Sequence, residues 1–357
     1  MPNSDNNIFQ SYPPFFRPNQ HYAIDHGEKS TISNSLSQSE STNLHISCPN
    51  SDSDSDSQTI PVIDFQGMGP ENLGQVCREW GMFRLVNHGV PMSLLTQLHE
   101  KAHKIFNLGF DFKQGLLTNP VLYFWGSPAI SLSGTAGDNL NWLEGLNVPL
   151  DKTSRFQYED PLLQSFRSLL EEYGSHQTRL AKAIFRTIAQ DLKFPPTKLK
   201  SYLSTPTGFL RVYRYLRCPM EDQRWGINAH TDSSVFSILH QDQVGGLQVY
   251  KNNKWLDVKP IRDTLIVNLG DMMQAMSNDS YISVAHRVKV NRQKERISIG
   301  YFVFPAENAV IESTKYKPFT YTDFQAEKEM DLKTVGKKIG LPKFRKDGAV
   351  AAYHWLE

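Results

Sequence analysis

The fold is decided by the stretch from Val235 to Asn268, which reads VFSILHQDQVGGLQVYKNNKWLDVKPIRDTLIVN. Short runs of β-branched and aromatic residues alternate there with turn residues, and KNNKW at 251–255 is typical of a hairpin turn. The same texture extends outward to Gly208 and Pro305. We expect strands at 208–215, 235–241, 247–250, 255–258, 264–268, 285–290 and 296–304. Strands at this spacing, flanked by helices, predict a closed β-sandwich or barrel with a helical jacket.

The flanking sequence predicts the helices and the domain limits. Apolar residues recur every three or four positions over 160–192, with Asp160 as a natural N-cap and Pro161 at the first helical position. We expect two helical pieces within 70–115, separated by a strand at 80–89, a loop-rich region over 116–150 and a helical segment near 321–340. The predicted domains are an N-terminal region with helices (59–200), a catalytic core (201–310) and a C-terminal helical segment (311–357).

Residues 1–58 are predicted to be a disordered tail. Between Ser30 and Ser57, eleven of 28 residues are serine, and the stretch ends in SDSDSDS at 51–57. Such a composition has too little apolar surface to offset the entropy lost on ordering. We therefore expect that its removal leaves the core unaffected.

Charge and cysteine content bound the functional classes. Lys and Arg number 38 against 37 Asp and Glu, so the formal net charge is +1, which disfavours nucleic-acid or anionic-membrane binding. No apolar run is long enough for a membrane span, and no secretory signal is visible. Three separate cysteines indicate a reducing compartment. We expect a monomeric, soluble enzyme in the cytoplasm, or also in the nucleus, that acts on a small molecule.

His230-Thr231-Asp232 is the strongest candidate for chemistry. On a strand, residues i and i+2 share a face, so His230 and Asp232 are expected to converge. His286, which lies 56 residues after His230, can supply a third ligand from a distant strand. Two imidazoles and one carboxylate leave three octahedral positions open, as non-haem Fe(II) oxygenases require. The same set can hold Zn(II) for hydrolysis, so the triad alone does not name the reaction.

The last predicted strand begins with Arg296-Ile297-Ser298, ten residues past His286. Strand alternation places five of its side chains on one face: Arg296, Ser298, Gly300, Phe302 and Phe304. A guanidinium fork and a hydroxyl group suit a carboxylate ligand better than a lysine would. An isolated pair of this kind is usually an edge-strand arginine in a salt bridge. Its place one strand beyond a candidate metal ligand favours a carboxylate site.

The combination of HTD at 230–232, His286 and Arg296-x-Ser298 resembles the 2-oxoglutarate- and Fe(II)-dependent dioxygenases of plants. The similarity runs from Ile60 to about residue 330 and includes WGMFRLVNHGVP at 80–91. The resemblance implies a protein that is mainly β with flanking helices, built on a double-stranded β-helix (jelly-roll) core. It also implies an enzyme that uses Fe(II), 2-oxoglutarate and O2, supported by ascorbate, to hydroxylate an apolar metabolite.

The resemblance also assigns the site residues. It implies iron held by His230, Asp232 and His286, no catalytic residue beyond these ligands, and 2-oxoglutarate gripped by Arg296 and Ser298. Tyr215 matches the tyrosine of the family's NYYPPCP motif, which implies a further 2-oxoglutarate contact. That motif departs from the family pattern here, since it reads YRYLRCP at 213–219. The change from asparagine to Tyr213 puts the local orientation around 2-oxoglutarate in doubt.

Sequence motifs that are less specific than the metal site concern the substrate. HQDQVGGLQV at 240–249, WLEG at 142–145 and KPFTY at 317–321 look most like gibberellin oxidases, and the 2-oxidases that inactivate the hormone are the closest branch. We expect a gibberellin or a precursor, hydroxylated at ring carbon 2. The candidate substrate residues are Phe302 and Phe304 as pocket walls, Tyr123, Phe124 and Trp142 at the mouth, and Arg214 and Arg217 as contacts to a substrate carboxylate.

Three alternatives stay open at this point. The enzyme could act on another plant metabolite, such as a flavonoid, an alkaloid or another hormone, since fold and iron site do not choose among them. A non-catalytic jelly-roll binding protein is disfavoured because all four of His230, Asp232, His286 and Arg296 are present. A zinc hydrolase leaves Arg296 and Ser298 without a use.

Overall fold

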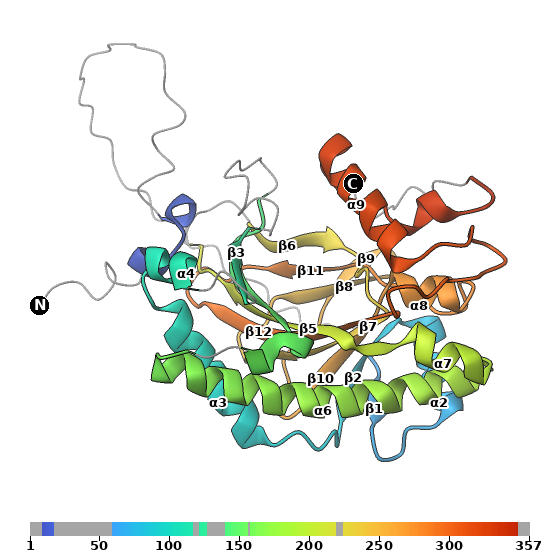
Figure 1. Ribbon diagram of the computed structural model, residues 1–357, viewed down its shortest axis with the longest axis horizontal. Helices are drawn as coiled ribbons and strands as arrows, with labels where there is room; N and C mark the ends of the chain where they lie inside the picture. Colours follow the sequence, from blue (N-terminus) through green and yellow to red (C-terminus); the bar gives the residue numbers. More distant parts are fainter. Residues whose placement is uncertain are drawn as a thin grey trace, which may run out of the picture.

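Two β-sheets face each other at the centre of the molecule, seen here in a computed structural model that describes residues 9–17, 59–116, 121–126, 140–155, 158–218 and 224–348 (Figure 1). The larger sheet has the order β1-β2-β10-β7-β12-β5-β4-β3, and the smaller has the order β6-β11-β8-β9. The strands are β1 (Val62–Asp64), β2 (Met82–Val86), β3 (Leu122–Trp125), β4 (Leu143–Pro149), β5 (Ser204–Tyr215), β6 (Trp225–His230), β7 (Phe236–Gln241), β8 (Leu247–Lys251), β9 (Lys254–Asp257), β10 (Leu265–Leu269), β11 (His286–Lys289) and β12 (Arg296–Phe304). This confirms the predicted jelly-roll core with flanking helices.

Helices cover the outer face of the larger sheet. The 31-residue α6 runs beneath the sheet beside α2 and α3 (Figure 1). Asp160 accepts hydrogen bonds from the amides of Leu162 and Leu163, so the predicted N-cap is confirmed. The helical segments are η1 (Pro14–Phe16), α2 (Pro70–Glu79), α3 (Met92–Phe106), α4 (Phe110–Leu116), η2 (Leu150–Arg155), α6 (Pro161–Asp191), α7 (Pro196–Tyr202), α8 (Asp271–Met276), α9 (Tyr321–Thr334) and η3 (Leu341–Phe344).

Alternation along β12 divides its side chains between two environments. Ile297, Ile299 and Tyr301 belong to the large apolar core between sheet and helices. The intervening residues, beginning with Arg296 and Ser298, therefore face the smaller sheet. The strand β5 shows the same division, since Val212 packs on the helix side and Tyr213 and Tyr215 pack between the sheets. This inner space is where a site can form.

Most of the predicted elements are confirmed, but three strands were missed. Each of the seven predicted strands overlaps an observed one, and the β8–β9 hairpin turns at Asn252 and Asn253, whose φ values are +51° and +59°. The region 116–150 is not only loop, because β3 and β4 extend the larger sheet beside β5. The strand β6, which carries His230 at its end, pairs with β11 in the smaller sheet.

The prediction of a disordered tail is wrong for residues 9–17. Tyr12 and Phe16 are fully or almost fully buried, and they pack with Trp142 and Leu216 in a small cluster of their own. The aromatic side chains supply the apolar surface that the serine-rich stretch lacks. The stretch from Ser30 to Ser57 lies outside the described residues.

Within the described part of the chain, none of the helices combines the length and the apolar character needed to cross a bilayer.

Candidate active site

Three potential metal ligands converge at one end of the smaller sheet. His230 ends β6, His286 begins β11, and the two residues are direct partners in the ladder. The Oδ1 atom of Asp232 lies 3.7 Å from Nε2 of His230 and 3.8 Å from Nε2 of His286. One ligand atom from each of the three lies within 4.8 Å of the others. The sequence-predicted triad is therefore assembled.

Asp232 is positioned by hydrogen bonds and not, as expected, by strand alternation. The strand β6 ends at His230, so Asp232 lies in the following loop and strand alternation does not place it. Instead, its Oδ2 atom accepts hydrogen bonds from Ser237 Oγ at 3.0 Å and from Asn268 Nδ2 at 2.8 Å. These donors, on β7 and β10, fix the carboxylate and leave Oδ1 directed at the imidazoles. The larger sheet thus orients a ligand that belongs to a loop.

The histidines present their Nε2 atoms in the form that binds metal. His230 Nδ1 lies 2.7 Å from the carbonyl of Asn228, and His286 Nδ1 lies 3.3 Å from that of Val284. A carbonyl only accepts, so each Nδ1 carries the proton and each Nε2 keeps a free lone pair. Burial, together with the neighbouring His286, lowers the pKa of His230 to about 3. The neutral imidazole required of a ligand is therefore the stable form at neutral pH.

The carboxylate is also ionised. Burial alone would raise the pKa of Asp232, but His286, His230 and the hydrogen bonds from Asn268 and Ser237 bring it below its ordinary value. An anionic carboxylate with two neutral imidazoles on one side is the donor set of the 2-His-1-carboxylate facial triad. The residues present fit Fe(II).

A buried arginine at the start of β12 has no carboxylate partner among the described residues. Arg296 is 2 % exposed, and its guanidinium lies 4.6 Å from the ring centroid of Tyr215. Its Nη1 and Nη2 donate to Ser298 Oγ at 3.2 Å and Gln241 Oε1 at 2.9 Å. Its Nε has no partner, and among the described residues no carboxylate pairs with it. A buried charge in this state calls for an anionic ligand, and the carboxylate of 2-oxoglutarate fits the donors.

The five predicted substrate residues do not lie in one place. Phe302, Phe304 and Phe124 lie on the sheet face that looks towards the smaller sheet, and Phe302 and Phe304 each stack on Phe209, with ring centroids 5.4 and 5.2 Å away. Tyr123 faces the opposite side, where its hydroxyl donates to Glu144. Trp142 packs against Phe16, with ring centroids 4.7 Å apart. Tyr123 and Trp142 are thus engaged elsewhere.

The prediction that Arg214 contacts the substrate is wrong, and the prediction for Arg217 is not tested. Arg214 is fully buried on the helix side of β5, where Nη2 lies 2.5 Å from Glu144 Oε1. Alternation explains the error, because a neighbour of Tyr215 on the strand must point to the opposite face. The guanidinium of Arg217 lies 5.0 Å from the ring centroid of Phe9, in the N-terminal segment.

Sequence reasoning missed the residues that support the site. Ser237, Gln241 and Asn268 are polar residues at inward positions of β7 and β10, and they hold Asp232 or Arg296. A polar residue that interrupts the apolar alternation of a core strand is the signal that could have revealed them. Lys338, whose Nζ donates to Asp271 Oδ2 at 2.8 Å and to the carbonyl of Thr231, was also missed.

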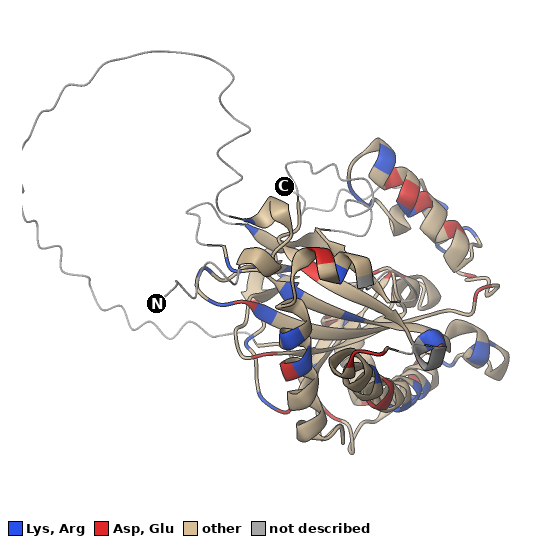
Figure 2. Cartoon of the chain, turned by 60° about the vertical axis from the view of Figure 1, so that its left-hand side comes forward, with Lys and Arg blue, Asp and Glu red and all other residues tan. Residues whose placement is uncertain are grey.

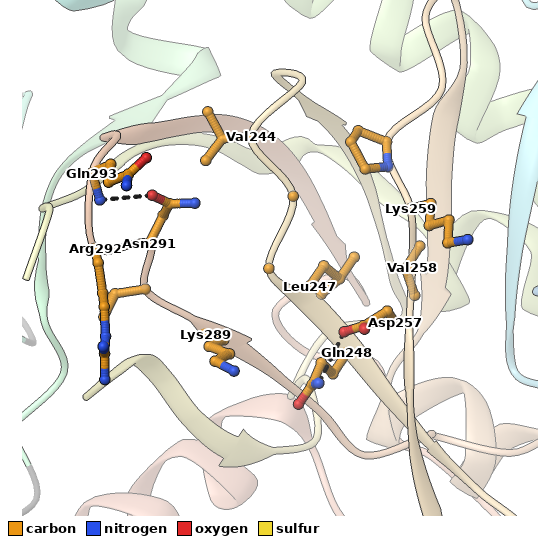
Figure 3. A pocket seen from close by; sticks show the side chains of 14 residues that line it. Val244, Leu247, Gln248, Asp257, Val258, Lys259, Lys289, Asn291, Arg292 and Gln293 are labelled. Atoms are coloured by element: carbon orange, nitrogen blue, oxygen red, sulfur yellow. Dashed lines mark hydrogen bonds between the residues drawn. The ribbon is translucent and has the colours of Figure 1, made fainter. Parts of the chain in front are cut away.

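A separate cavity of about 550 Å³ lies at the other end of the smaller sheet (Figure 3). It is lined by Leu247, Gln248 and Asp257 on β8 and β9, and by Lys289 and Arg292 at the end of β11. None of the three triad residues is among the residues that line this cavity. His286 begins β11, whereas the cavity lies at the other end of that strand, at Lys289. It is not the site described above.

Comparison with known proteins agrees with this geometry. The profile of the 2OG-Fe(II) oxygenase superfamily matches residues 206–305, and a profile described as non-haem dioxygenase in morphine synthesis N-terminal matches residues 60–165. Gibberellin 2-beta-dioxygenase 6 of Oryza sativa subsp. japonica is 34% identical over 78% of this chain and 80% of its own length. Gibberellin 2-beta-dioxygenase 8 of Arabidopsis thaliana is 36% identical over 77% and 80%.

Among solved structures, the crystal structure of JOX2 in complex with 2OG, Fe, and JA superposes with a TM-score of 0.66. It is 28% identical in sequence, and the match covers 75% of this chain and 84% of that one. The likeness in fold therefore extends over three quarters of this chain.

Proposed function

The chain belongs to the 2OG-Fe(II) oxygenase superfamily, and on that premise we propose that it hydroxylates a gibberellin or a gibberellin precursor at ring carbon 2. As a member of the family it is a dioxygenase that uses Fe(II), 2-oxoglutarate and O2. The proposal about the substrate is supported by one observation, the 34–36% identity to two gibberellin 2-beta-dioxygenases over about four fifths of their length. Such an enzyme inactivates the hormone.

In this proposal His230, Asp232 and His286 bind the iron, and Arg296, Ser298 and Tyr215 bind the cosubstrate. When bound, iron and 2-oxoglutarate supply the oxidising power that converts a C–H bond to C–OH, with release of succinate and CO2. The protein's own part is orientation. Ser237 and Asn268 hold Asp232 in place, and Gln241 and Ser298 hold the guanidinium of Arg296 in the plane that a carboxylate needs.

The walls of the site keep water away from the reacting centre. Phe302 and Phe304 line the inner face of β12 beyond Ser298, and Phe209 stacks on both. An apolar wall of this kind suits a rigid, largely hydrocarbon substrate and excludes competing water. We propose Phe302, Phe304 and Phe124 as the apolar part of the substrate site.

A dioxygenase acting on another plant metabolite is the second candidate. It is supported by the similarity to JOX2, whose crystal structure holds JA. The experiment incubates the purified enzyme with Fe(II), ascorbate and 2-oxoglutarate, and with gibberellins of both carbon counts. Products are identified by mass spectrometry and succinate is measured in parallel. A 2-hydroxylated gibberellin formed in step with succinate supports the proposal. Succinate release without gibberellin consumption rejects this substrate and keeps the enzyme class.

The remaining parts of the proposal concern partners and location. We propose a monomer in the cytoplasm, or also in the nucleus, with no nucleic-acid partner. Acidic and basic residues are interspersed along the elements in Figure 2, and the formal net charge is +1. A balance of acidic and basic residues of this kind is not typical of a protein that binds a phosphate backbone.

A further inference from the structure

An arginine without a counter-ion lies in the middle of the inner face of β5. Arg211 pairs in register with Gly300 on β12 and with Asn147 on β4. Its Nε donates to Asn147 Oδ1 at 3.1 Å, and its Nη1 donates to the Tyr213 hydroxyl at 3.3 Å. Both partners are neutral. Among the described residues no carboxylate forms an ion pair with Arg211.

Aromatic side chains connect this arginine to the C-terminal helix. The Arg211 guanidinium lies 4.8 Å from the ring centroid of Phe209 and 5.7 Å from that of Phe302. Phe209 stacks on Phe304, and Phe304 in turn packs against Tyr321 of α9, with ring centroids 4.6 Å apart. The inner face of the larger sheet thus continues onto the inward face of α9.

A second cation lies on that inward face. Four of the fourteen residues of α9 are not exposed, namely Tyr321, Phe324, Lys328 and Asp331, and their spacing of three, four and three is that of one helix face. Asp331 is paired, since its carboxylate binds Lys343 at 2.5 Å and accepts from the amides of Ile339 and Gly340. Lys328 forms no hydrogen bond or ion pair with a described residue.

Arg211 and Lys328 also interact electrostatically. Burial, together with the charges of Arg211 and Lys338, lowers the pKa of Lys328 to about 8, and Asp232 and Asp271 offset this only in part. Neither acid serves as a counter-ion for Lys328, because Asp271 pairs with Lys338 at 2.8 Å and Asp232 belongs to the triad. Both Arg211 and Lys328 feel the charge of Asp232, and neither has a carboxylate partner of its own among the described residues, so a ligand that brings an anion would satisfy both.

We propose that Arg211 and Lys328 together bind a carboxylate of the substrate, so that the enzyme selects carboxylic acids over neutral molecules of the same shape. The inference rests on the proposed location of the substrate site beside the triad, and it does not require that the acid be a gibberellin. Arg211 supplies a planar donor pair and Lys328 a point charge from the opposite side. The aromatic row between them contacts the apolar body of the substrate. Both are specificity-determining residues and neither is a metal ligand.

The test compares acids with their methyl esters. The probes are a gibberellin, jasmonic acid and indole-3-acetic acid, each with its ester, added without oxygen to enzyme loaded with Fe(II) and 2-oxoglutarate. Binding is followed through the visible absorption band of the loaded site, and KM and kcat are then measured in air. The wild type should bind at least one acid about tenfold or more tightly than its ester, as expected for charge-assisted hydrogen bonds.

The variants are Lys328→Met and Arg211→Gln, with Lys328→Arg as the conservative exchange. The control is Lys333→Met, on the exposed face of the same helix. Lys328→Met and Arg211→Gln should reduce the preference for acid over ester to near unity and raise KM for the acid, with the KM for 2-oxoglutarate unchanged. Lys328→Arg should retain most of the preference, and Lys333→Met all of it.

The outcomes separate this inference from the proposed function. If the enzyme prefers jasmonic or indole-3-acetic acid over its ester and does not bind gibberellin, the carboxylate site is supported and the gibberellin proposal is rejected. If the wild type binds acids and esters equally, or binds none of the acids, the inference is overturned. It is also overturned if folded Lys328→Met and Arg211→Gln enzymes keep the wild-type preference.

Discussion

The two carboxylate oxygens of Asp232 have different partners. Oδ2 accepts hydrogen bonds from Ser237 and Asn268, and Oδ1 is directed at the histidines. The substitution Asp232→Asn keeps the shape but removes the charge, so we expect loss of iron binding and of turnover with little change in Tm. Anaerobic Fe(II) titration and thermal melts by circular dichroism measure both. Asp257→Asn, at the far end of the smaller sheet, is the matched control and should behave as wild type. An unaltered iron affinity in Asp232→Asn would rule out the triad.

Arg296 supports a second prediction about a single residue. Arg296→Lys keeps a positive charge but loses the fork that Ser298 and Gln241 hold in place, which should cost about 1–3 kcal/mol of 2-oxoglutarate binding. The apparent KM for 2-oxoglutarate should therefore rise by about 5- to 150-fold, while Fe(II) affinity stays the same. Arg262→Lys, on an exposed loop, is the control. A KM that does not change would place the carboxylate clamp elsewhere.

Spacing in the sequence was enough to find the residues that face the site from strand ends. His230, His286 and the Arg296–Ser298 pair lie on strands, where period two fixes the face. Sequence spacing did not explain the position of Asp232, because hydrogen bonds from β7 and β10 place this side chain. The assignment of Arg214 to the site failed although alternation from Tyr215 could have excluded it and selected Arg211 instead.

At the scale of elements, the strands that the sequence revealed are those with strong apolar alternation. The missed β3 and β4 are stabilised mainly by their pairing with each other and with β5, and a local pattern cannot show such a partner. The strand β6 was missed because it carries polar residues, including Asn228 and His230. The 31-residue α6 was predictable because its N-cap and its apolar stripe are both local signals.

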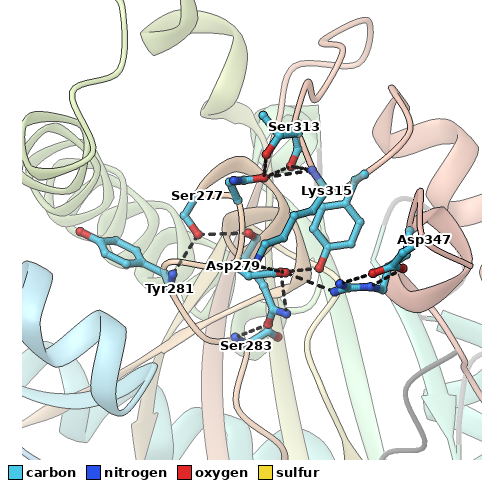
Figure 4. A network of polar contacts seen from close by, with 12 residues as sticks. Ser277, Asp279, Tyr281, Ser283, Ser313, Lys315 and Asp347 are labelled. Carbon is cyan, nitrogen blue, oxygen red and sulfur yellow. Dashed lines mark hydrogen bonds and ion pairs between the residues drawn. The ribbon is translucent and has the colours of Figure 1, made fainter. Parts of the chain in front are cut away.

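The loop between α8 and β11 is tied to the C-terminal segment by a polar network (Figure 4). Asp279 accepts from Tyr316 and Gln274 and pairs with Lys315 and Arg345. Burial alone would raise the pKa of Asp279, but the hydrogen bonds from Tyr316, Lys315 and Gln274 bring it below the ordinary value of 3.8. Because this loop leads to His286, the network links the C-terminal segment to the site.

This network predicts a pH dependence of stability. Since the folded-state pKa of Asp279 lies below the unfolded one, its contribution is complete above about pH 5 and is lost as the pH falls through the folded value. Asp279→Asn should thus lower the free energy of unfolding by about 1–3 kcal/mol at pH 7, and the two proteins should converge in strong acid. Urea unfolding at a series of pH values measures this.

The matched control for this change is Asp263→Asn, because Asp263 is exposed and shares the positive φ of Asp279, +55° against +61°. Asparagine tolerates this conformation as well as aspartate does, so backbone strain is not altered. An equal loss of stability for both variants, or a loss that persists unchanged in acid, would contradict the role of the Asp279 charge.

At the scale of the whole molecule, the N-terminal segment closes a buried charge cluster. Glu144 pairs with Lys113 at 2.8 Å and with Arg214 at 2.5 Å, and all three side chains are fully buried. Ser11 caps the cluster, since its carbonyl accepts from Lys113 and its hydroxyl accepts from Arg214. Composition averaged over 1–58 hid this segment, although Phe9, Tyr12, Phe15 and Phe16 stand within eight residues.

Deletion of residues 1–17 should therefore destabilise the protein. The loss of the buried Tyr12 and Phe16 side chains and the exposure of Lys113 and Glu144 are partly offset by the entropy of nine residues that need no longer be ordered. We expect a net loss of about 1–3 kcal/mol, or about 2–5 °C in Tm. The double substitution Tyr12→Ala/Phe16→Ala should reproduce it, and deletion of residues 1–6 should not. A Tm unchanged by the longer deletion would restore the original expectation of a dispensable tail.

The docked segment is joined to β1 only through residues 18–61, yet it holds its place by contacts of its own on the far edge of the larger sheet. Because the segment and the core belong to one chain, docking of the segment is an intramolecular step and does not depend on protein concentration. We expect the segment and the rest of the chain to behave as complementing fragments. A synthetic peptide of residues 7–18, titrated into a chain that begins at residue 59, should therefore restore Tm along a saturable binding curve.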